Sequence, residues 1–388
     1  MHRDPTFLQT LWFVLIGVLW VGYFVLEGFD FGVGMLLRAI GRTTSEKRAL
    51  VHTIGPVWDG NEVWLLVAGG ATFAAFPGWY ASLFSGAYLA LFLVLAGLIA
   101  RGVAFEFWGK HDTPRWRATW EWAAAVGSFV PALLWGVAWA NIVRGIPLNA
   151  EHDMTGSLLT LLNPYALLGG LTTLALFVAH GAIFLTLRLE DELLERAARI
   201  ARVAAPVAGV LLTVFLGWTV FGLDGGVSAV PLVLAVAAVG LAAAVPLTAR
   251  RERWALAFGL SAGAIALLVC VFFAQLFPNA LPSTTSAAFD LTLREASSTS
   301  YTLTVMTVVA VLFVPLVVAY QAWTYWVFRA RIGVADFEQV KSPIDLVAKV
   351  TGGTPGGGKS GGAGGGAAGG RGAGGAGGGA AGPATPGA

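Results

Sequence analysis

Long apolar segments alternate with short polar connections along almost the whole chain, and this alternation predicts the fold class. A helix of roughly 20 apolar residues crosses a hydrocarbon core of about 30 Å. The segments that reach this length are 7–37, 56–76, 79–106, 120–143, 164–187, 203–223, 228–249, 254–277 and 301–329. The pattern therefore predicts an all-α polytopic membrane protein with about nine transmembrane helices.

The basic residues predict the orientation of these helices. Of the 24 lysines and arginines, all but Arg3, Arg144 and Arg294 fall in alternate connections or in the C-terminal segment. Short cytoplasmic connections accumulate lysine and arginine. We therefore expect the N-terminus outside the cytoplasm and the C-terminus inside. A missed or invented helix would invert every later connection, so the helix number and the orientation support each other.

Composition agrees with a membrane domain followed by a tail. Only 12% of the residues are charged, against roughly 25% in soluble domains. The first apolar segment lacks a small-residue cleavage pattern and is interpreted as a retained helix. We expect a transmembrane domain over 1–332 and a cytoplasmic tail over 333–388. From about residue 352 the tail is rich in glycine and has little apolar side chain to bury, so it is predicted to be disordered.

Acidic residues occur where a membrane segment rarely tolerates them. Glu27 and Asp30 lie three residues apart in the first span, and Asp59 and Glu62 lie three apart at the start of the second. An ionisable residue at the bilayer centre costs at least about 2.5–3.5 kcal/mol and usually has a function. Three-residue spacing places each pair on one helix face. The four carboxylates are therefore candidate functional groups near the cytoplasmic leaflet.

Three further charged residues are predicted to share this depth. Arg101 and Glu106 lie where the third span ends, and Glu121 lies where the fourth begins. One interpretation is structural, in which the acids cap helices or pair with Arg101, and it is favoured for Glu106 and Glu121 taken singly. The other is a cytoplasmic entry for protons, because acids inside membranes often form proton relays.

Residues that could bind a cofactor are scarce. Haem iron usually takes histidine or methionine ligands inside a bundle. Only His180 of the five histidines lies well within a span, and the membrane methionines Met35 and Met306 lie towards opposite faces. The single cysteine, Cys270, excludes an internal disulfide. We expect His180 to have a hydrogen-bonded core role and the chain to bind no haem or metal firmly. No motif indicates a nucleic-acid partner.

Two segments carry a specific resemblance. Residues 28–34 (GFDFGVG) and 55–64 (GPVWDGNEVW) resemble subunit II of the cytochrome bd-type quinol oxidases. Further matching segments are 101–107, 127–131, 162–164, 277–283, 303–307 and 320–325. The resemblance runs in order through about 7–332.

The resemblance implies two four-helix bundles plus a peripheral helix, in a bacterial cell membrane. It implies a haem-free subunit that forms a heterodimer with subunit I. That partner would hold haems b and d, oxidise quinol and reduce O₂ to water in aerobic respiration. A structural quinone on this chain is left open. The short connection between the sixth and seventh spans and the glycine-rich tail depart from some members.

The resemblance also implies roles for the acids. The family's proton path is expected to use the aspartate of the Trp-Asp-Gly motif, here Asp59, with Asp30 as the next candidate. The other candidate residues of this path are Glu27, Glu62, Arg101 and Glu106.

Two rival functions use the same residues differently. A proton-coupled secondary transporter would also have buried acids, but it predicts broken helices at mid-membrane, and the acids here are predicted to lie nearer one surface. A purely structural assembly subunit would transfer no protons. The sequence does not exclude this second rival.

Overall fold

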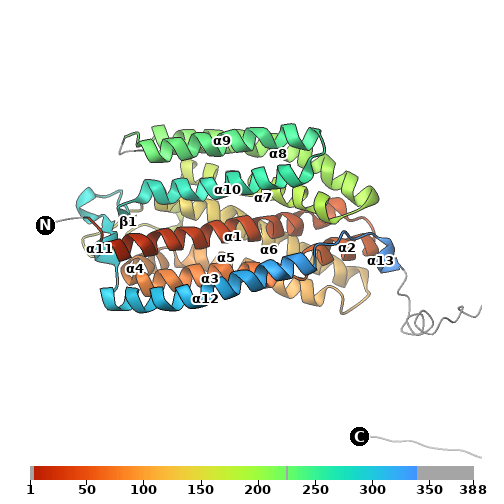
Figure 1. The fold of residues 1–388 in the computed structure, drawn as a ribbon, viewed down its shortest axis with the longest axis horizontal. Coiled ribbons are helices and arrows are strands. Elements are labelled where there is room, and N and C mark those ends of the chain that lie inside the picture. Colours follow the sequence, from red (N-terminus) through yellow and green to blue (C-terminus); the bar gives the residue numbers. More distant parts are fainter. Residues whose placement is uncertain (1–3, 224–225, 339–388) are drawn as a thin grey trace, which may run out of the picture. The chain divides into compact units, whose positions relative to one another are not determined.

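The computed structural model describes residues 4–223 and 226–338, so the expected glycine-rich tail lies outside the described residues. The described chain is almost entirely helical (Figure 1). Eight helices are long and apolar enough to cross a membrane, and the bent pair of α3 (Trp58–Ala75) and α4 (Pro77–Gly86) adds a ninth if it counts as one span. The eight are α1 (Phe7–Ile40), α5 (Tyr88–Phe107), α6 (Pro114–Arg144), α7 (Pro164–Arg188), α8 (Asp191–Phe221), α9 (Ala229–Arg250), α10 (Trp254–Leu276) and α12 (Ser300–Val327). The predicted fold class is confirmed.

The third predicted span is not one continuous helix. The segment 79–106 is divided at Ala87 into α4 and α5, and α3 and α4 meet at an angle of 120°. Phe76 leaves the helical conformation with φ −132° and ψ 67°, and Pro77 then begins α4, as proline commonly does. At the break between α4 and α5, a Cβ added at Gly86 would lie 2.8 Å from the sulfur of Met154. The connection after α6 is therefore packed against the α4–α5 junction.

Short elements occupy the two ends of the helix bundle (Figure 1). One end holds α2 (Thr44–Ile54) and α13 (Ala335–Glu338), which contact each other. We call it the basic end, because most of the described lysines and arginines lie there. The opposite end holds η1 (Leu158–Leu161), η2 (Ala287–Phe289), α11 (Leu293–Ala296) and an antiparallel pair of short strands, β1 (Asn279–Leu281) and β2 (Leu291–Thr292).

The long helices form two groups of four. In one group α1 packs on α3 and α6, and α6 packs on α5; in the other, α7, α8, α9 and α10 pack in sequence, with α10 returning to α7. The groups are joined by the packing of α6 on α7 and by the contacts of α1 with α7 and α10. α12 is peripheral and mostly exposed, and the Trp12 indole secures it by donating to the Leu303 carbonyl at 3.1 Å and to the Thr307 hydroxyl at 3.0 Å.

Glycines bring two helices of the bundle into close contact. α1 and α7 cross where Gly32 meets Gly181, and a Cβ added at Gly32 would lie 2.7 Å from the Gly181 Cα. Small residues let membrane helices approach closely and gain dispersion contacts. This crossing holds the segment of α1 that carries Glu27 and Asp30 against the second group of helices.

Candidate functional site

A buried cluster of charged side chains joins three helices near the basic end. Arg101 of α5 is fully buried, and its Nη2 contacts a carboxylate oxygen of Glu27 on α1, which is also fully buried. The same nitrogen lies 3.4 Å from Oε2 of Glu62 on α3. The guanidinium carbon lies 4.8 Å from the centre of the Phe31 ring. A buried charge is tolerated only when it is paired, so these contacts hold Arg101 between two acids.

Asp30 belongs to a second, adjoining network. Its Oδ2 accepts a hydrogen bond from the Asn61 side-chain nitrogen at 2.7 Å, and both residues are fully buried. The Asn61 side-chain oxygen in turn accepts from the Tyr325 hydroxyl at 2.7 Å and from the Gln321 amide at 3.3 Å. Three helices, α1, α3 and α12, therefore meet around one amide side chain.

Several atoms of these networks have no hydrogen-bond partner among the described residues. They are both carboxylate oxygens of Glu27, Oδ1 of Asp30, and Nε and Nη1 of Arg101. The contact between Glu27 and Arg101 is an ion pair whose geometry falls outside that of a hydrogen bond. Buried polar atoms are nearly always paired, and a group of unpaired ones is the setting in which internal water molecules bind.

Two of the candidate acids lie at the surface instead. Asp59 is exposed at the start of α3, where Oδ1 accepts from the Gly60 backbone nitrogen at 2.7 Å. Glu106 is exposed near the end of α5. Asp59 lies one helical turn before the half-buried Glu62. The structure thus brings Glu27, Asp30, Glu62 and Arg101 together and leaves Asp59 and Glu106 outside the buried cluster.

Glu121 has a separate environment at the basic end. Its carboxylate oxygens lie 2.7 Å from Nη1 of Arg38 and 2.8 Å from Nζ of Lys47. The Trp108 indole also donates to it at 3.4 Å. These contacts connect α6 with α1 and α2 at the membrane surface, which is the structural role considered for this residue.

His180 is fully buried and both of its ring nitrogens have protein partners. Nδ1 lies 2.7 Å from the Ser261 hydroxyl and Nε2 lies 3.1 Å from the Val25 carbonyl, while Phe258 stacks on the ring at 4.5 Å. A haem ligand needs a ring nitrogen directed at the iron, so His180 does not fit that role. Within residues 4–223 and 226–338, no group of three or more His, Cys, Asp or Glu side chains is placed to hold a metal ion.

The sequence did not single out Asn61, which binds Asp30, or the two residues that bind Asn61 in turn. Asn61 lies inside the segment 55–64 that carries the resemblance, and its position among the acids was the available signal. Gln321 and Tyr325 lie four residues apart in the apolar last span, which places them on one helix face. Polar side chains at that spacing in a membrane helix would have indicated a contact with another polar group.

Comparison with known proteins identifies the family of the chain. The family model described as cytochrome bd terminal oxidase subunit II matches residues 8–328. Cytochrome bd ubiquinol oxidase subunit 2 of Bacillus subtilis is 41% identical, over 84% of this chain and 97% of that protein. Cytochrome bd-I ubiquinol oxidase subunit 2 of Escherichia coli is 38% identical, over 87% of this chain and 98% of that protein.

A solved structure has the same fold. The bd oxidase from Geobacillus thermodenitrificans matches with a TM-score of 0.60, over 83% of this chain and 99% of that one. At 14% identity this likeness concerns the fold alone. The family match covers most of the chain, as do the two sequence relatives. The chain therefore belongs to the cytochrome bd terminal oxidase subunit II family and is a multi-pass membrane subunit of an oxidoreductase complex.

Proposed function

We propose that this chain is the haem-free second subunit of a quinol oxidase in a bacterial cell membrane. Its partner is a subunit I that holds haems b and d, oxidises quinol and reduces O₂ to water. The relatives named as ubiquinol oxidase subunits support the substrate class. The basic end faces the cytoplasm in this proposal, because it carries most of the arginines and lysines.

The outer face of α3 is the proposed contact with the partner. Gly60 and Gly70 lie on it with open space beside them, and Leu66, with 68% of its surface exposed, lies between them. The glycines of α1 and α7, by contrast, are closely packed within the chain. Small residues on an outward face allow another membrane helix to approach closely. A helix of subunit I docked there would lie directly beside Asp59.

The acids form a proposed proton route from the basic end towards the partner. Asp59 takes up a proton at the surface, Glu62 receives it one turn further along α3, and Glu27 and Asp30 hold it within the membrane. The observation that supports this route is the placement of Glu62, which is half-buried between exposed Asp59 and the buried Arg101–Glu27 pair. Glu106, exposed on α5, is a second surface position from which protons can enter.

Charge balance also favours a proton-carrying role. Among the described residues, the two adjoining networks hold three carboxylates, those of Glu27, Asp30 and Glu62, and one buried guanidinium, that of Arg101, which contacts Glu27 and Glu62. Excess negative charge in a membrane is costly, and binding a proton removes it. Arg101 stabilises the cluster in either protonation state, because one acid always remains to pair with it.

Replacing Asp59 tests the route. Asp59→Asn keeps the size of the side chain but removes the titratable group. We expect the complex to assemble with normal haem content while quinol oxidase turnover falls by at least roughly tenfold, as for loss of an acid–base group. Asp59→Glu should restore part of the turnover. The measurement is oxygen consumption with quinol, normalised to the haem absorbance of the purified complex.

The matched control is Asp112→Asn, which removes an exposed acid from the same end of the bundle. It should leave turnover unchanged. Full turnover of Asp59→Asn in an assembled complex would remove this residue from any essential route. A complex that tolerates Asp59→Asn but loses assembly with Asp59→Glu would favour the purely structural subunit. The transporter alternative is not favoured, since the relatives are oxidase subunits.

A further inference from the structure

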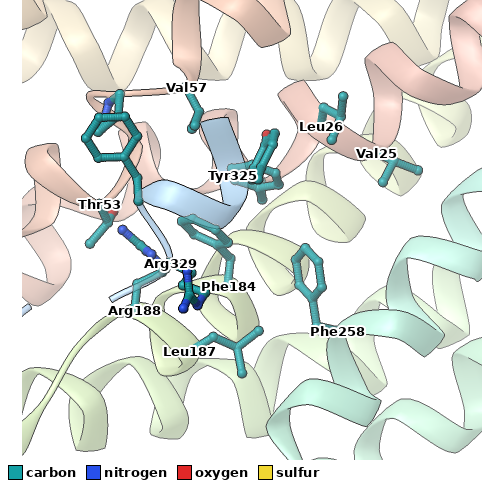
Figure 2. Close-up of a pocket in the computed structure, with 13 residues that line it drawn as sticks. Val25, Leu26, Thr53, Val57, Phe184, Leu187, Arg188, Phe258, Tyr325 and Arg329 are labelled. Atoms are coloured by element: carbon teal, nitrogen blue, oxygen red, sulfur yellow. The ribbon is translucent and has the colours of Figure 1, made fainter. Parts of the chain in front are cut away.

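A pocket separate from the acid cluster opens near the basic end. Its volume is about 370 Å³, and it lies among α1, α7, α10, the end of α12 and the turn before α3 (Figure 2). The lining is mainly apolar and aromatic, and it includes the buried Phe29 and Phe184 and the partly buried Phe258. Among the described residues that line it, the charged ones are Arg188 and Arg329, and none is acidic. The pocket therefore combines an apolar wall with positive charge.

The two arginines occupy one part of this pocket. In Figure 2, Arg188 and Arg329 lie to one side, and Val25, Leu26 and Phe258 lie to the other. Arg188 is the last residue of α7 and Arg329 follows the end of α12. The two segments are held together there because the Ile332 nitrogen donates to the Arg188 carbonyl at 2.8 Å. The pocket is thus polar at the basic end and apolar towards the membrane interior.

Neither arginine has an acidic partner among the described residues. The Arg188 Nε is buried and has no hydrogen-bond partner there. Arg329 stacks on the Trp326 ring, with its guanidinium carbon 4.4 Å from the ring centre, and its Nη1 donates to the Trp326 carbonyl. Three other cations at this end, Arg38, Lys47 and Arg196, bind carboxylates. Burying a donor of a charged group without an acceptor is costly. An anion bound in the pocket would supply the missing acceptor.

We propose that this pocket binds an anionic phospholipid. The phosphate accepts hydrogen bonds from Arg188 and Arg329, and the first part of an acyl chain lies against Phe29, Phe184 and Phe258. Basic pockets between membrane helices are suited to anionic lipid headgroups, and arginine matches the geometry of a phosphate. A neutral ligand would fill the apolar part but leave both positive charges uncompensated.

The position of the pocket suits a ligand that enters from the bilayer. Phe328 and Arg329 are exposed, so the pocket opens at the surface beside the end of α12. Pockets for small ligands measure about 300–1,000 Å³, and this volume is smaller than a complete two-chain lipid. The remainder of the lipid therefore lies outside, along the exposed apolar face of α12. Tyr325 lines the pocket and also donates to Asn61, which binds Asp30. The proposed lipid would therefore contact the hydrogen-bond network of Asp30.

Lipid retention by the purified two-subunit complex tests the proposal. Native mass spectrometry of the wild-type complex should show phosphatidylglycerol bound after detergent washing. After further delipidation, added dioleoyl-phosphatidylglycerol should raise the thermal midpoint of the complex, and dioleoyl-phosphatidylcholine should not. Arg188→Gln combined with Arg329→Gln should abolish both effects. The control pair Arg250→Gln and Arg251→Gln removes exposed cations at the same end and should change neither.

The wild-type comparison of the two lipids stands even if the double variant fails to assemble. Equal stabilisation by phosphatidylcholine would overturn the proposal, because the arginines would then select nothing. A quinone retained in place of phosphatidylglycerol would also overturn it. Stabilisation by inorganic phosphate alone, equal to that by phosphatidylglycerol and lost in the double variant, would show an anion site without a lipid and would overturn it as well.

Discussion

At the residue scale, Glu46 ties three segments together outside the membrane-spanning helices. Its two carboxylate oxygens each lie 3.0 Å from a guanidinium nitrogen of Arg196, and it accepts from the backbone nitrogens of Arg42 and Thr43 at 2.6 and 3.1 Å. Arg196 also donates to the Ile40 carbonyl at 2.8 Å. One ion pair thus connects the end of α1, the start of α2 and α8.

These contacts make the stability of this corner dependent on pH. The Arg196 guanidinium, helped by the two backbone donors, lowers the pKa of Glu46 to about 2. The pKa in the unfolded chain is about 4.3. A lowered pKa stabilises the fold above the unfolded value, and this contribution disappears as the pH falls towards the folded value. We expect Glu46→Gln to lower the thermal midpoint of the complex at pH 7, and the difference from wild type to shrink below about pH 4.3.

Glu192→Gln is the control for this comparison. Glu192 contacts the same arginine at 2.8 Å, but its side chain is 65% exposed and the pair is open to solvent. Exposed ion pairs contribute little, so this variant should remain close to wild type at every pH. A Glu46→Gln effect that stays constant from pH 7 to pH 3 would show that the side chain acts through packing and not through its charge.

The sequence identified the unusual residues more successfully than their partners. Glu27 and Asp30 stand out because an acid within an apolar span is rare whatever surrounds it. Arg101 was considered as a partner because it is predicted to share their depth, and it contacts Glu27. Asn61, the partner of Asp30, lies on another helix and was not singled out, because hydropathy carries no information about which helix faces meet. Asp59 and Glu62 share a helix face by spacing, yet only Glu62 lies in the buried contact with Arg101.

At the scale of elements, the crossing of α1 and α7 depends on the absence of side chains. Gly32 and Gly181 bring the two backbones into direct contact, since a Cβ added at Gly181 would lie 2.6 Å from the Gly32 Cα. Backbone atoms cannot move aside as a flexible side chain can. The crossing therefore fixes the distance between α1 and α7.

Gly181→Ala should accordingly weaken the assembled complex. Overpacking at a rigid contact costs about 1–3 kcal/mol. We expect a lower thermal midpoint. The measurement is the loss of haem absorbance as the purified complex is heated. Gly259→Ala on α10 is the matched control, because no atom lies within 4 Å of a Cβ added there. A Gly181→Ala complex as stable as the control would mean that the helices can separate without loss.

The helices themselves were largely predictable, and the exception is the division of the predicted span 79–106. Apolar length sets each span, so the predicted ranges from 120 onwards lie within or close to the observed helices. The division at Ala87 was missed because the apolar pattern continues unbroken through it. At this division Gly86 packs against Met154, a residue from a distant connection.

At the scale of the whole molecule, the unequal charge of the two ends predicts the orientation in the membrane. Val227 and Arg251 flank α9 and are both exposed. In a background that carries Cys270→Ser, Val227→Cys should react with a membrane-impermeant maleimide added to intact cells. Arg251→Cys should react only after the cytoplasmic side is opened. Labelling of Arg251→Cys in intact cells would reverse the proposed orientation.

The buried charges also impose an order on biogenesis. Synthesis proceeds from the N-terminus, so α1 reaches the bilayer before Asn61 and Arg101 have been translated. An unpaired aspartate opposes membrane insertion by up to about 2.5–3.5 kcal/mol, the value at the centre of a helix, and Glu27 adds to the cost of inserting Asp30. This cost is relieved only when α3 and α5 arrive. The side chains proposed to carry protons in the finished subunit thereby favour the release of these three helices from the insertion machinery as one unit.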